Sequence, residues 1–434
     1  KNGSMIEKII NPPREKWKEI NTRPNYSSQL IDNKVKKIFM SVKKNGDKAL
    51  FRYAEKYEGV KLKKLNVKQE NIQNSKNLIS EDLKNSIKIA KKNIEKFHRS
   101  QKSKSDHIII EKGIECWLEK RPIEKVGLYI PGGSAPLFST ILMLAIPAKI
   151  VGCDEIIICS PPNREGKIPA VILYTAYLCG ISKIFKVGGA QAIAAMTFGT
   201  ESIPSVLKIF GPGNQYVTSA KQFATRYNVS IDLPAGPSEL LIYADESSIP
   251  KYVASDFLSQ TEHGPDSQVI LVTTNKQIIK PIFKEINRQI PFLKRKDFIK
   301  QSIQNSKIIY FDLKEKAVNY INDYAPEHYI ICSKDEDYFI ENVKNAGSVF
   351  IGNYSCESIG DYASGTNHTL PTNGYAKQYS GVNLDSFLKK ISFQKVTAEG
   401  IKKIGPAVEI MSIAEGLDAH KNSVTIRLND LKNE

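Results

Sequence analysis

The sequence predicts an α/β protein made of two tandem Rossmann-like parallel-sheet domains, with an N-terminal helical arm and a small C-terminal helical module. Short runs rich in Val, Ile and Leu alternate with helical segments from residue 123 onwards, and a second alternating series starts near residue 239. Because successive parallel strands are joined by crossovers that usually contain a helix, this alternation favours mostly parallel sheets. The length of 434 residues agrees, since it is too long for one ordinary core.

Four parts are expected along the chain. Residues 5–110 are polar, with apolar residues at helical spacing, and are expected to form the helical arm. The first α/β domain is expected at 111–236 and the second at 237–380. The tail from Gln394 onwards has an amphipathic helical pattern, and residues 381–434 are expected to form the C-terminal helical module. The apolar runs expected to be strands are IEKVGLYI (123–130), EIIICS (155–160), ISKIFKV (181–187), VLKIF (206–210), ELLIYA (239–244), QVILVTT (268–274), KIIYF (307–311), HYIICS (328–333) and SVFIG (348–352).

The net charge of +16 raises the alternative of a nucleic-acid-binding protein. The lysines are spread along the chain among acidic residues, and no RNA-recognition, zinc-finger or basic-zipper pattern accompanies them. We therefore expect no nucleic-acid partner. No apolar run reaches about 18 residues, so no membrane partner is expected either. Six cysteines without CxxC spacing, and an N-terminus without a signal-peptide or transit pattern, favour a cytoplasmic protein with reduced thiols.

The stretch LSQTEHGPDSQ at 258–268 places Gln260 and His263 three residues apart, so that both side chains share one face of a helix. Glu262 lies beside them, and a Gly-Pro pair ends the helix. By itself the stretch fits a helix cap as well as a metal or substrate site, because one His with one Gln is a weak metal signal. The motifs further along the chain decide between these interpretations.

Three glycine-containing turns follow strands of the first domain: PGGSAP (131–136), GGAQA (188–192) and GPGN (211–214). Glycine lets backbone amides and a helix N-terminus approach a phosphate. None of the three spells GxGxxG, and tight packing between strand and helix explains each turn on its own. Three such turns on one sheet edge favour a ligand cleft, because open α/β sheets bind ligands beyond the carboxyl ends of their strands.

Glu327 and His328 are adjacent in the segment Ala325-Pro326-Glu327-His328. Adjacent side chains diverge in a strand or a helix, so these two share a site only at an irregular corner, which Pro326 favours. A histidine that titrates near neutral pH and a glutamate that activates water can form a general-base pair. A surface Glu-His pair in a loop is the alternative.

Two further motifs combine an acid with a histidine. The polar, glycine-flanked GDYASGTNH carries Asp361 and His368, and EGLDAH carries Glu415 and His420. Four of the six histidines therefore lie in acid-bearing motifs after residue 258. This concentration favours one shared site.

Taken together, the motifs resemble those of the histidinol dehydrogenases, from about residue 10 to residue 430. The segments that carry the resemblance are, in order, VGLYIPGGSAPLFST, VGGAQAIAA, IFGPGN, DLPAGPSE, LSQTEHGPDSQ, NDYAPEH, GDYASGTNH and EGLDAH. The resemblance implies an enzyme with one zinc ion per subunit that oxidises L-histidinol through L-histidinaldehyde to L-histidine with two NAD, the last step of histidine biosynthesis. It also implies a homodimer in which His420 reaches a site formed mostly by the partner subunit, so that the C-terminal module is exchanged.

The resemblance also implies, position by position, which residues form the site. The zinc ligands would be Gln260, His263, Asp361 and His420. The substrate contacts would be Ser238, Gln260, His263, His328, Asp361, His368, Glu415 and His420. The NAD contacts would be Tyr129, Gln191 and Asn214, on or beside the glycine turns. In catalysis, His328 would be the base that deprotonates the alcohol, and Glu327 would activate the water that attacks the aldehyde.

The sequence offers two alternative chemistries. A zinc-dependent hydrolase would also combine a metal with a Glu-His pair, but the HExxH motif is absent and the glycine turns call for a second ligand. A cysteine could carry the aldehyde oxidation through a thiohemiacetal, with Cys332 or Cys356 as the nucleophile. The resemblance implies instead that both cysteines are dispensable.

Overall fold

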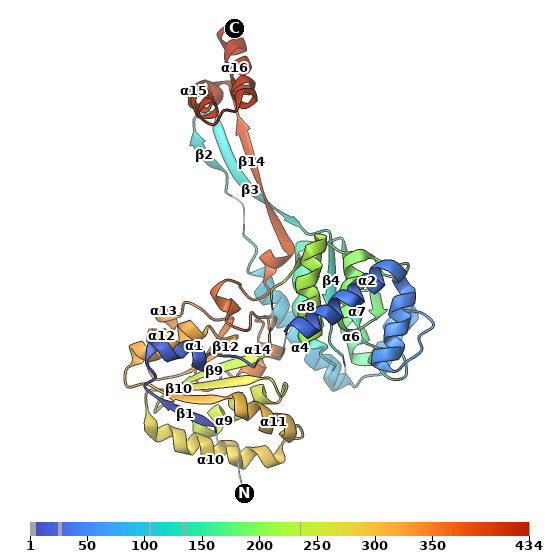
Figure 1. Cartoon of the computed structure of the whole chain (residues 1–434), viewed down its shortest axis with the longest axis vertical. Helices are drawn as coiled ribbons and strands as arrows, with labels where there is room; N and C mark the ends of the chain where they lie inside the picture. Colours follow the sequence, from blue (N-terminus) through green and yellow to red (C-terminus); the bar gives the residue numbers. More distant parts are fainter. Residues whose placement is uncertain (1–5, 25–27, 104–105, 133–135, 235, 434) are drawn as a thin grey trace. The chain divides into compact units, whose positions relative to one another are not determined.

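The computed structural model describes residues 6–24, 28–103, 106–132, 136–234 and 236–433, and the chain divides into two compact units (Figure 1). The first unit comprises Lys1–Gln101 and Ile123–Ser386 and contains two parallel sheets. The second unit comprises Lys102–Pro122 and Phe387–Glu434 and contains an antiparallel sheet and two helices. The expected α/β class with two tandem parallel sheets is confirmed.

The first parallel sheet has five strands in the order β6-β5-β4-β7-β8. Its strands are β4 (Lys125–Tyr129), β5 (Glu155–Ser160), β6 (Lys183–Lys186), β7 (Lys208–Phe210) and β8 (Ser230–Ile231). The helices between them are α5 (Ser139–Val151), α6 (Ala170–Leu178), α7 (Gly189–Phe198) and α8 (Gln215–Ala224). The chain order reverses between β4 and β7, which is the switch point where open α/β sheets bind ligands.

The second parallel sheet repeats this order and adds one edge strand, giving β1-β11-β10-β9-β12-β13. Its strands are β1 (Glu7–Ile10), β9 (Glu239–Ala244), β10 (Gln268–Thr273), β11 (Lys307–Tyr310), β12 (His328–Cys332) and β13 (Ser348–Ile351). Its helices are α9 (Pro250–Thr261), α10 (Ile279–Gln289), α11 (Lys296–Ser302), α12 (Lys314–Tyr324), α13 (Glu336–Asn342) and α14 (Glu357–Tyr362). Strands β9 and β10 are buried along their whole length, as parallel strands covered on both faces should be.

The N-terminal residues are mostly helical, as expected, but they pack into both α/β halves of the first unit. The helices are α1 (Trp17–Ile20), α2 (Ser28–Tyr53), α3 (Gln69–Asn74) and α4 (Glu81–Arg99). Strand β1 joins the six-stranded sheet beside β11, Trp17 and Ile20 are buried in the core of that sheet, and α2 packs on α7 and α8. The apolar stripes of these amphipathic helices need a surface that buries them, and the two sheets supply it.

The second unit joins the C-terminal helices to two strands from much earlier in the chain. Its elements are β2 (Ile108–Glu111), β3 (Ile114–Pro122), β14 (Leu388–Val396), α15 (Ala398–Ala414) and α16 (Asp418–Asn433), with the sheet order β14-β3-β2. The prediction of a wholly helical tail is therefore wrong for β14, and that of a helical arm up to residue 110 is wrong for β2. Strand β14 is mostly exposed and pairs with a distant segment, so no local pattern of buried residues marks it.

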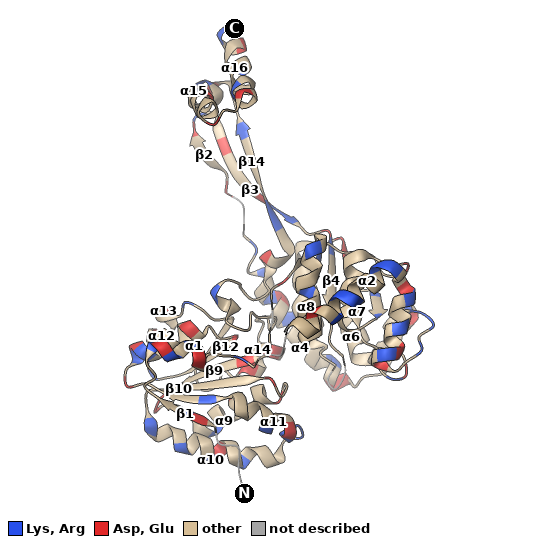
Figure 2. Ribbon diagram, viewed as in Figure 1, with Lys and Arg blue, Asp and Glu red and all other residues tan. Residues whose placement is uncertain are grey.

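Charges of both signs cover the helices. In Figure 2, lysine and arginine lie on several helices, α2 and α10 among them, and are interspersed with aspartate and glutamate. This distribution agrees with solvated helix faces. Within the described residues, none of the helices combines the length and the apolar character that a membrane crossing requires.

Candidate functional site

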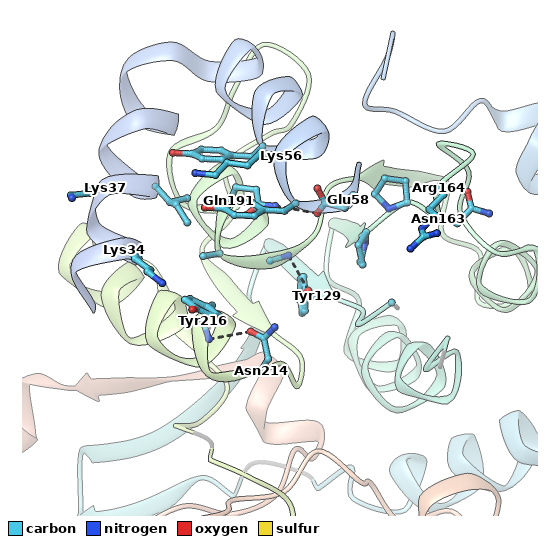
Figure 3. A pocket seen from close by; sticks show the side chains of 18 residues that line it. Lys34, Lys37, Lys56, Glu58, Tyr129, Asn163, Arg164, Gln191, Asn214 and Tyr216 are labelled. Carbon is cyan, nitrogen blue, oxygen red and sulfur yellow. Dashed lines mark hydrogen bonds between the residues drawn. The ribbon is translucent and has the colours of Figure 1, made fainter. Parts of the chain in front are cut away.

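A cavity of about 1150 Å³ lies at the carboxyl ends of the strands in the five-stranded sheet (Figure 3). Its walls come from the end of β4, the starts of α7 and α8, helix α2 and the π-helical turn η2 (Ala54–Glu58). It therefore lies at the switch point of the strand order, where ligands bind to open α/β sheets. The volume slightly exceeds the range of about 300–1,000 Å³ that is usual for small-molecule sites, so an extended ligand fits.

The three residues expected to contact NAD, Tyr129, Gln191 and Asn214, all line this cavity. Tyr129 ends β4, and its hydroxyl oxygen accepts a hydrogen bond from the backbone N–H of Gly189 at 3.0 Å. Asn214 caps α8, and its Oδ1 accepts hydrogen bonds from two backbone amides of the first turn at 3.0 and 3.2 Å. Burial raises the pKa of Tyr129 to about 12, so its hydroxyl stays neutral and can donate to a ligand.

The glycine turns shape the cavity. The turns GGAQA and GPGN lie at the starts of α7 and α8, whereas residues 133–135 of PGGSAP lie outside the described residues. Gly211 has φ +130°, and a Cβ there would overlap the carbonyl oxygen at the end of β4. Its N–H donates to Asp232 at 2.8 Å, its carbonyl accepts from Lys221 at 2.8 Å, and these two side chains form a buried ion pair. Asp232 and Lys221 thus fix the backbone N–H and carbonyl of Gly211, in the turn that carries Asn214.

Charged side chains surround the cavity. The cationic residues that line it are Lys34, Lys37, Lys56 and Arg164. Together with the N-termini of α7 and α8, they favour a ligand that carries negative charge. Glu58 also lines the cavity, and its Oε1 accepts a hydrogen bond from Gln191 Nε2 at 3.2 Å. Burial raises the pKa of Glu58 to about 7.

A second group of functional side chains lies at the amino ends of β9 and β12 in the six-stranded sheet. Glu327 and His328 stand at the start of β12, which pairs with β9. Ala325 ends α12 with φ 53° and ψ 68°, a left-handed conformation that alanine rarely adopts, and Pro326 follows. This is the irregular corner that the adjacent acid and histidine required, and it turns both side chains toward one site.

Carboxylates surround His328, which is almost fully buried. Its Nδ1 lies 3.5 Å from Glu327 Oε2 and 3.8 Å from Glu357 Oε1, and its Nε2 lies 3.4 Å from Asp361 Oδ1. Burial lowers the pKa of His328, but Glu357 and Glu327 raise it by more, so that it lies well above its usual range. A cation bound among these carboxylates would offset their charge and bring this pKa down.

Three side chains near His328 could hold a metal ion. His263, Glu357 and Asp361 each offer a ligand atom, and these atoms lie within 4.8 Å of one another. Helix α9 ends at Thr261, so Gln260 occupies its last turn and His263 follows in the next turn of chain, as the Gly-Pro pair predicted. Nitrogen and oxygen donors of this kind suit zinc, and the buried negative charge favours a cation. The described residues therefore fit a divalent ion.

A buried ion pair supports the corner. Arg23 binds Glu239 through Nε at 2.8 Å and Nη2 at 3.1 Å, and its guanidinium lies 3.8 Å from the ring centroid of Tyr324. The backbone N–H of Glu239 donates to Glu327 Oε2 at 2.9 Å. The carbonyl oxygen of Glu239 lies 3.3 Å from His328 Nδ1. Glu239 therefore connects the N-terminal segment to both members of the acid–histidine pair.

Two further expected residues lie close to this group. Ser238 directly precedes β9, at the amino ends of the strands, where His328 also begins the neighbouring strand β12. The ring nitrogens of His368 lie 2.9 Å from the carbonyl oxygen of Asp361 and 3.1 Å from Thr140 Oγ1. The structure thus brings together the expected residues Ser238, Gln260, His263, Glu327, His328, Asp361 and His368.

Glu415 and His420 belong to the second unit instead. Glu415 follows α15, His420 lies in the first turn of α16, and both side chains are exposed. The metal-binding group described above is formed by the first unit alone.

The cysteines take no visible part in either group. All six are free. Cys332 ends β12, whereas His328 begins it, and burial raises the pKa of the Cys332 thiol to about 12. A thiol with so high a pKa is a poor nucleophile.

Several residues of these groups were not predicted from the sequence, among them Arg23, Glu58, Glu239 and Glu357. Glu357 did carry a signal, because it stands four residues before Asp361 and so shares one face of α14. Arg23 carried none, because it lies 216 residues from its partner Glu239.

A large cavity at a Rossmann-type switch point, together with a buried histidine beside ligands for a cation, agrees with an α/β enzyme that binds a nucleotide and a metal ion. The family model for histidinol dehydrogenase matches residues 21–428. The chain is 52% identical over 428 residues to the histidinol dehydrogenase of Bacteroides thetaiotaomicron, with 99% of this chain and 100% of the relative covered. It is 47% identical over 416 residues to the chloroplastic histidinol dehydrogenase of Arabidopsis thaliana, with 95% and 89% covered.

The crystal structure of histidinol dehydrogenase from Elizabethkingia anophelis matches with a TM-score of 0.97 at 51% identity and covers 100% of both chains. The chain therefore belongs to the histidinol dehydrogenase family. Membership of an oxidoreductase family disfavours the hydrolase and nucleic-acid-binding alternatives.

Proposed function

We propose that the chain is a zinc- and NAD-dependent enzyme that oxidises L-histidinol through L-histidinaldehyde to L-histidine. The convergence of Gln260, His263, Glu327, His328 and Asp361 at one end of the six-stranded sheet is the observation that carries the proposal. Each of the two oxidations removes a hydride and a proton, so one substrate molecule consumes two NAD.

The metal would be held by Gln260, His263 and Asp361 of one subunit and by His420 of the partner subunit. When bound, zinc supplies a Lewis acid that the imidazole and amine of histidinol could chelate, which would orient the substrate. The donor set, with one exposed imidazole at its edge, supports this role because the site stays open to a ligand.

His328 would take the proton of the alcohol in the first oxidation. Its Nε2 lies 3.4 Å from Asp361 Oδ1, and it would be neutral and able to accept this proton once a bound cation offsets the surrounding carboxylates. In the second oxidation, Glu327 would take a proton from the water that adds to the aldehyde, and His328 would again accept the proton of the reacting hydroxyl. The hydrogen bond from the Glu239 N–H holds one oxygen of Glu327 in place for this step.

NAD would occupy the cavity of the five-stranded sheet, in contact with Tyr129, Gln191 and Asn214. The N-termini of α7 and α8 and the surrounding lysines suit its pyrophosphate. When bound, NAD accepts the hydride in each oxidation.

The active assembly would be a homodimer with exchanged C-terminal modules, in which Ser238 and His368 of one subunit contact the same substrate as Glu415 and His420 of its partner. The second unit exposes large apolar side chains, as interfaces do: Ile108 and Ile110 are 58% exposed and Ile109 is 75% exposed on β2, and Met411 is 64% exposed on α15. A cytoplasmic location is part of the same proposal, and the six free cysteines support it.

Two substitutions separate the proposed roles. Glu327→Gln should lower the oxidation of L-histidinaldehyde by about 10²- to 10⁴-fold and largely keep the oxidation of the alcohol, whereas His328→Asn should lower both. NADH formation is followed with each substrate in turn, and Glu341→Gln, an exposed acid on α13, is the matched control. Equal losses in both half-reactions for Glu327→Gln would contradict the role given to Glu327.

A further inference from the structure

The amide of Gln260 lies against the carboxylate of Glu357. Both residues are buried, with 0% and 1% of their surface exposed. One end of the amide lies 2.5 Å and 3.2 Å from the two carboxylate oxygens of Glu357. Because the oxygens of an ionised carboxylate only accept hydrogen bonds, the end of the amide that faces an ionised Glu357 is the nitrogen Nε2, and the oxygen Oε1 is the opposite end.

The orientation of this amide matters for a metal site. The amide oxygen can ligate a cation, whereas the amide nitrogen is a donor with no lone pair to offer. A glutamine that can rotate by 180° presents either end. The two hydrogen-bond acceptors of Glu357 permit one orientation only, so they leave the oxygen of Gln260 for the metal.

We propose that Glu357 is a positioning residue that fixes the amide oxygen of Gln260 toward the metal. The inference rests on the proposed zinc-dependent function and names a residue to which that function assigns no role. Metal ligands are commonly oriented by an outer hydrogen-bond partner in this way. Glu357 reaches Gln260 because it begins α14, which packs on α9, and Asp361 lies one turn further on the same helix.

The charges explain why an amide serves here. Glu327, Glu357 and Asp361 already surround His328, and Asp256 is buried one helical turn before Gln260 on α9. A further carboxylate in place of Gln260 would add repulsion among buried negative charges. A neutral ligand whose oxygen is held by a neighbouring carboxylate avoids this repulsion.

Glu357 is itself one of the three residues that could hold the ion, so the test must separate positioning from ligation. Three variants of the full chain do so: Glu357→Gln, the exchanged double variant Gln260→Glu/Glu357→Gln, and the control Glu341→Gln, at an exposed acid on α13. The double variant reverses the hydrogen bond, since Gln at 357 donates to Glu at 260, and it keeps an oxygen ligand at 260. Zinc affinity is measured by competition with a chelator, and the ligand field is read from the absorption spectrum of the cobalt(II) form.

Glu357→Gln replaces one of the two acceptor oxygens by a donor NH2, so the amide of Gln260 can then take either orientation, and zinc binding should weaken by about 10- to 100-fold, the usual effect of disturbing an outer hydrogen-bond partner. The double variant should recover most of this loss with a cobalt spectrum close to that of the parent protein, and Glu341→Gln should leave the affinity unchanged. Circular dichroism checks that each variant is folded.

Unchanged affinity in Glu357→Gln would overturn the inference and leave the zinc-dependent function standing. A double variant that fails to recover and shows an altered cobalt spectrum would also overturn it, by making Glu357 a direct ligand. If the parent protein bound no zinc, the proposed function would fail together with the inference.

Discussion

The ion pair between Arg23 and Glu239 should stabilise the irregular corner that carries Glu327 and His328. Its side chains are 10% and 1% exposed, and Arg23 makes two contacts to the carboxylate, at 2.8 and 3.1 Å, and a third to the carbonyl oxygen of Tyr324 at 2.6 Å. Arg23→Met leaves Glu239 buried without its counter-charge, and breaking a buried pair from one side costs about 3–5 kcal/mol of unfolding free energy. Net stabilities are about 5–15 kcal/mol, so this loss should be readily measured.

The loss should depend on pH. Burial raises the pKa of Glu239, and Arg23 lowers it. Without Arg23 the pKa of Glu239 rises further above its value in the unfolded chain, so the folded state takes up a proton as the pH falls and the deficit shrinks. The double variant Arg23→Met/Glu239→Gln should cost less than Arg23→Met at pH 8, because only a neutral amide is left in the site.

Urea unfolding followed by circular dichroism at pH 5 and pH 8 measures these differences. The control is Lys377→Met, which removes a half-exposed ion pair with Asp323 and should cost no more than about 1 kcal/mol. Activity should fall in Arg23→Met under native conditions, because the backbone of Glu239 holds Glu327 and faces His328. If Arg23→Met lost no more unfolding free energy than Lys377→Met, or lost the same amount at pH 5 and pH 8, the role given to the ion pair would be refuted.

Three further outcomes are expected. Burial raises the pKa of Asp256 to about 7, so the parent protein should lose stability as the pH rises from about 4 to about 7, whereas Asp256→Asn should not. Thermal melting should show the variant to be more stable than the parent by a few kcal/mol at pH 8. An equal difference in stability at both ends of this pH range would count against the prediction. Gly211→Ala should reduce kcat/KM for NAD by on the order of 10²-fold, because its Cβ overlaps the end of β4, whereas Gly152→Ala, with φ +85° and open space around it, should leave kcat/KM unchanged. Cys332→Ser should keep both half-reactions, and loss of the aldehyde oxidation alone would restore the thiohemiacetal alternative.

The parallel sheets were predictable because their strands are local signals. Runs such as EIIICS and QVILVT have four consecutive apolar residues at their centre, and turns or helices bound them on either side. Strand β1 has four residues, EKII, and takes its place only through pairing with β11 about 300 residues later. Strand β14 pairs with β3 across a similar separation and has lysines and apolar residues on an exposed ribbon. Neither pairing can be recognised from a short stretch of the sequence, because the paired strands lie far apart in the chain.

The site was predictable where the chemistry is confined to one segment. The helix end at Thr261 and the corner at Ala325 follow from a Gly-Pro pair and from Pro326, and both are present. The sequence could not place the acid–histidine group at the amino ends of β9 and β12, opposite to the usual position of ligands on such sheets. It also could not reveal Arg23, whose role comes entirely from a contact made in three dimensions.

The amount of NADH formed per molecule of L-histidinol tests the central proposal most directly. Purified protein with zinc and excess NAD receives limiting L-histidinol, and a sample treated with a chelator is the control. About two NADH per histidinol are expected, lost on chelation, because each of the two oxidations delivers one hydride. One NADH per histidinol would contradict the oxidation of the aldehyde, and none at any zinc concentration would contradict the proposed activity as a whole.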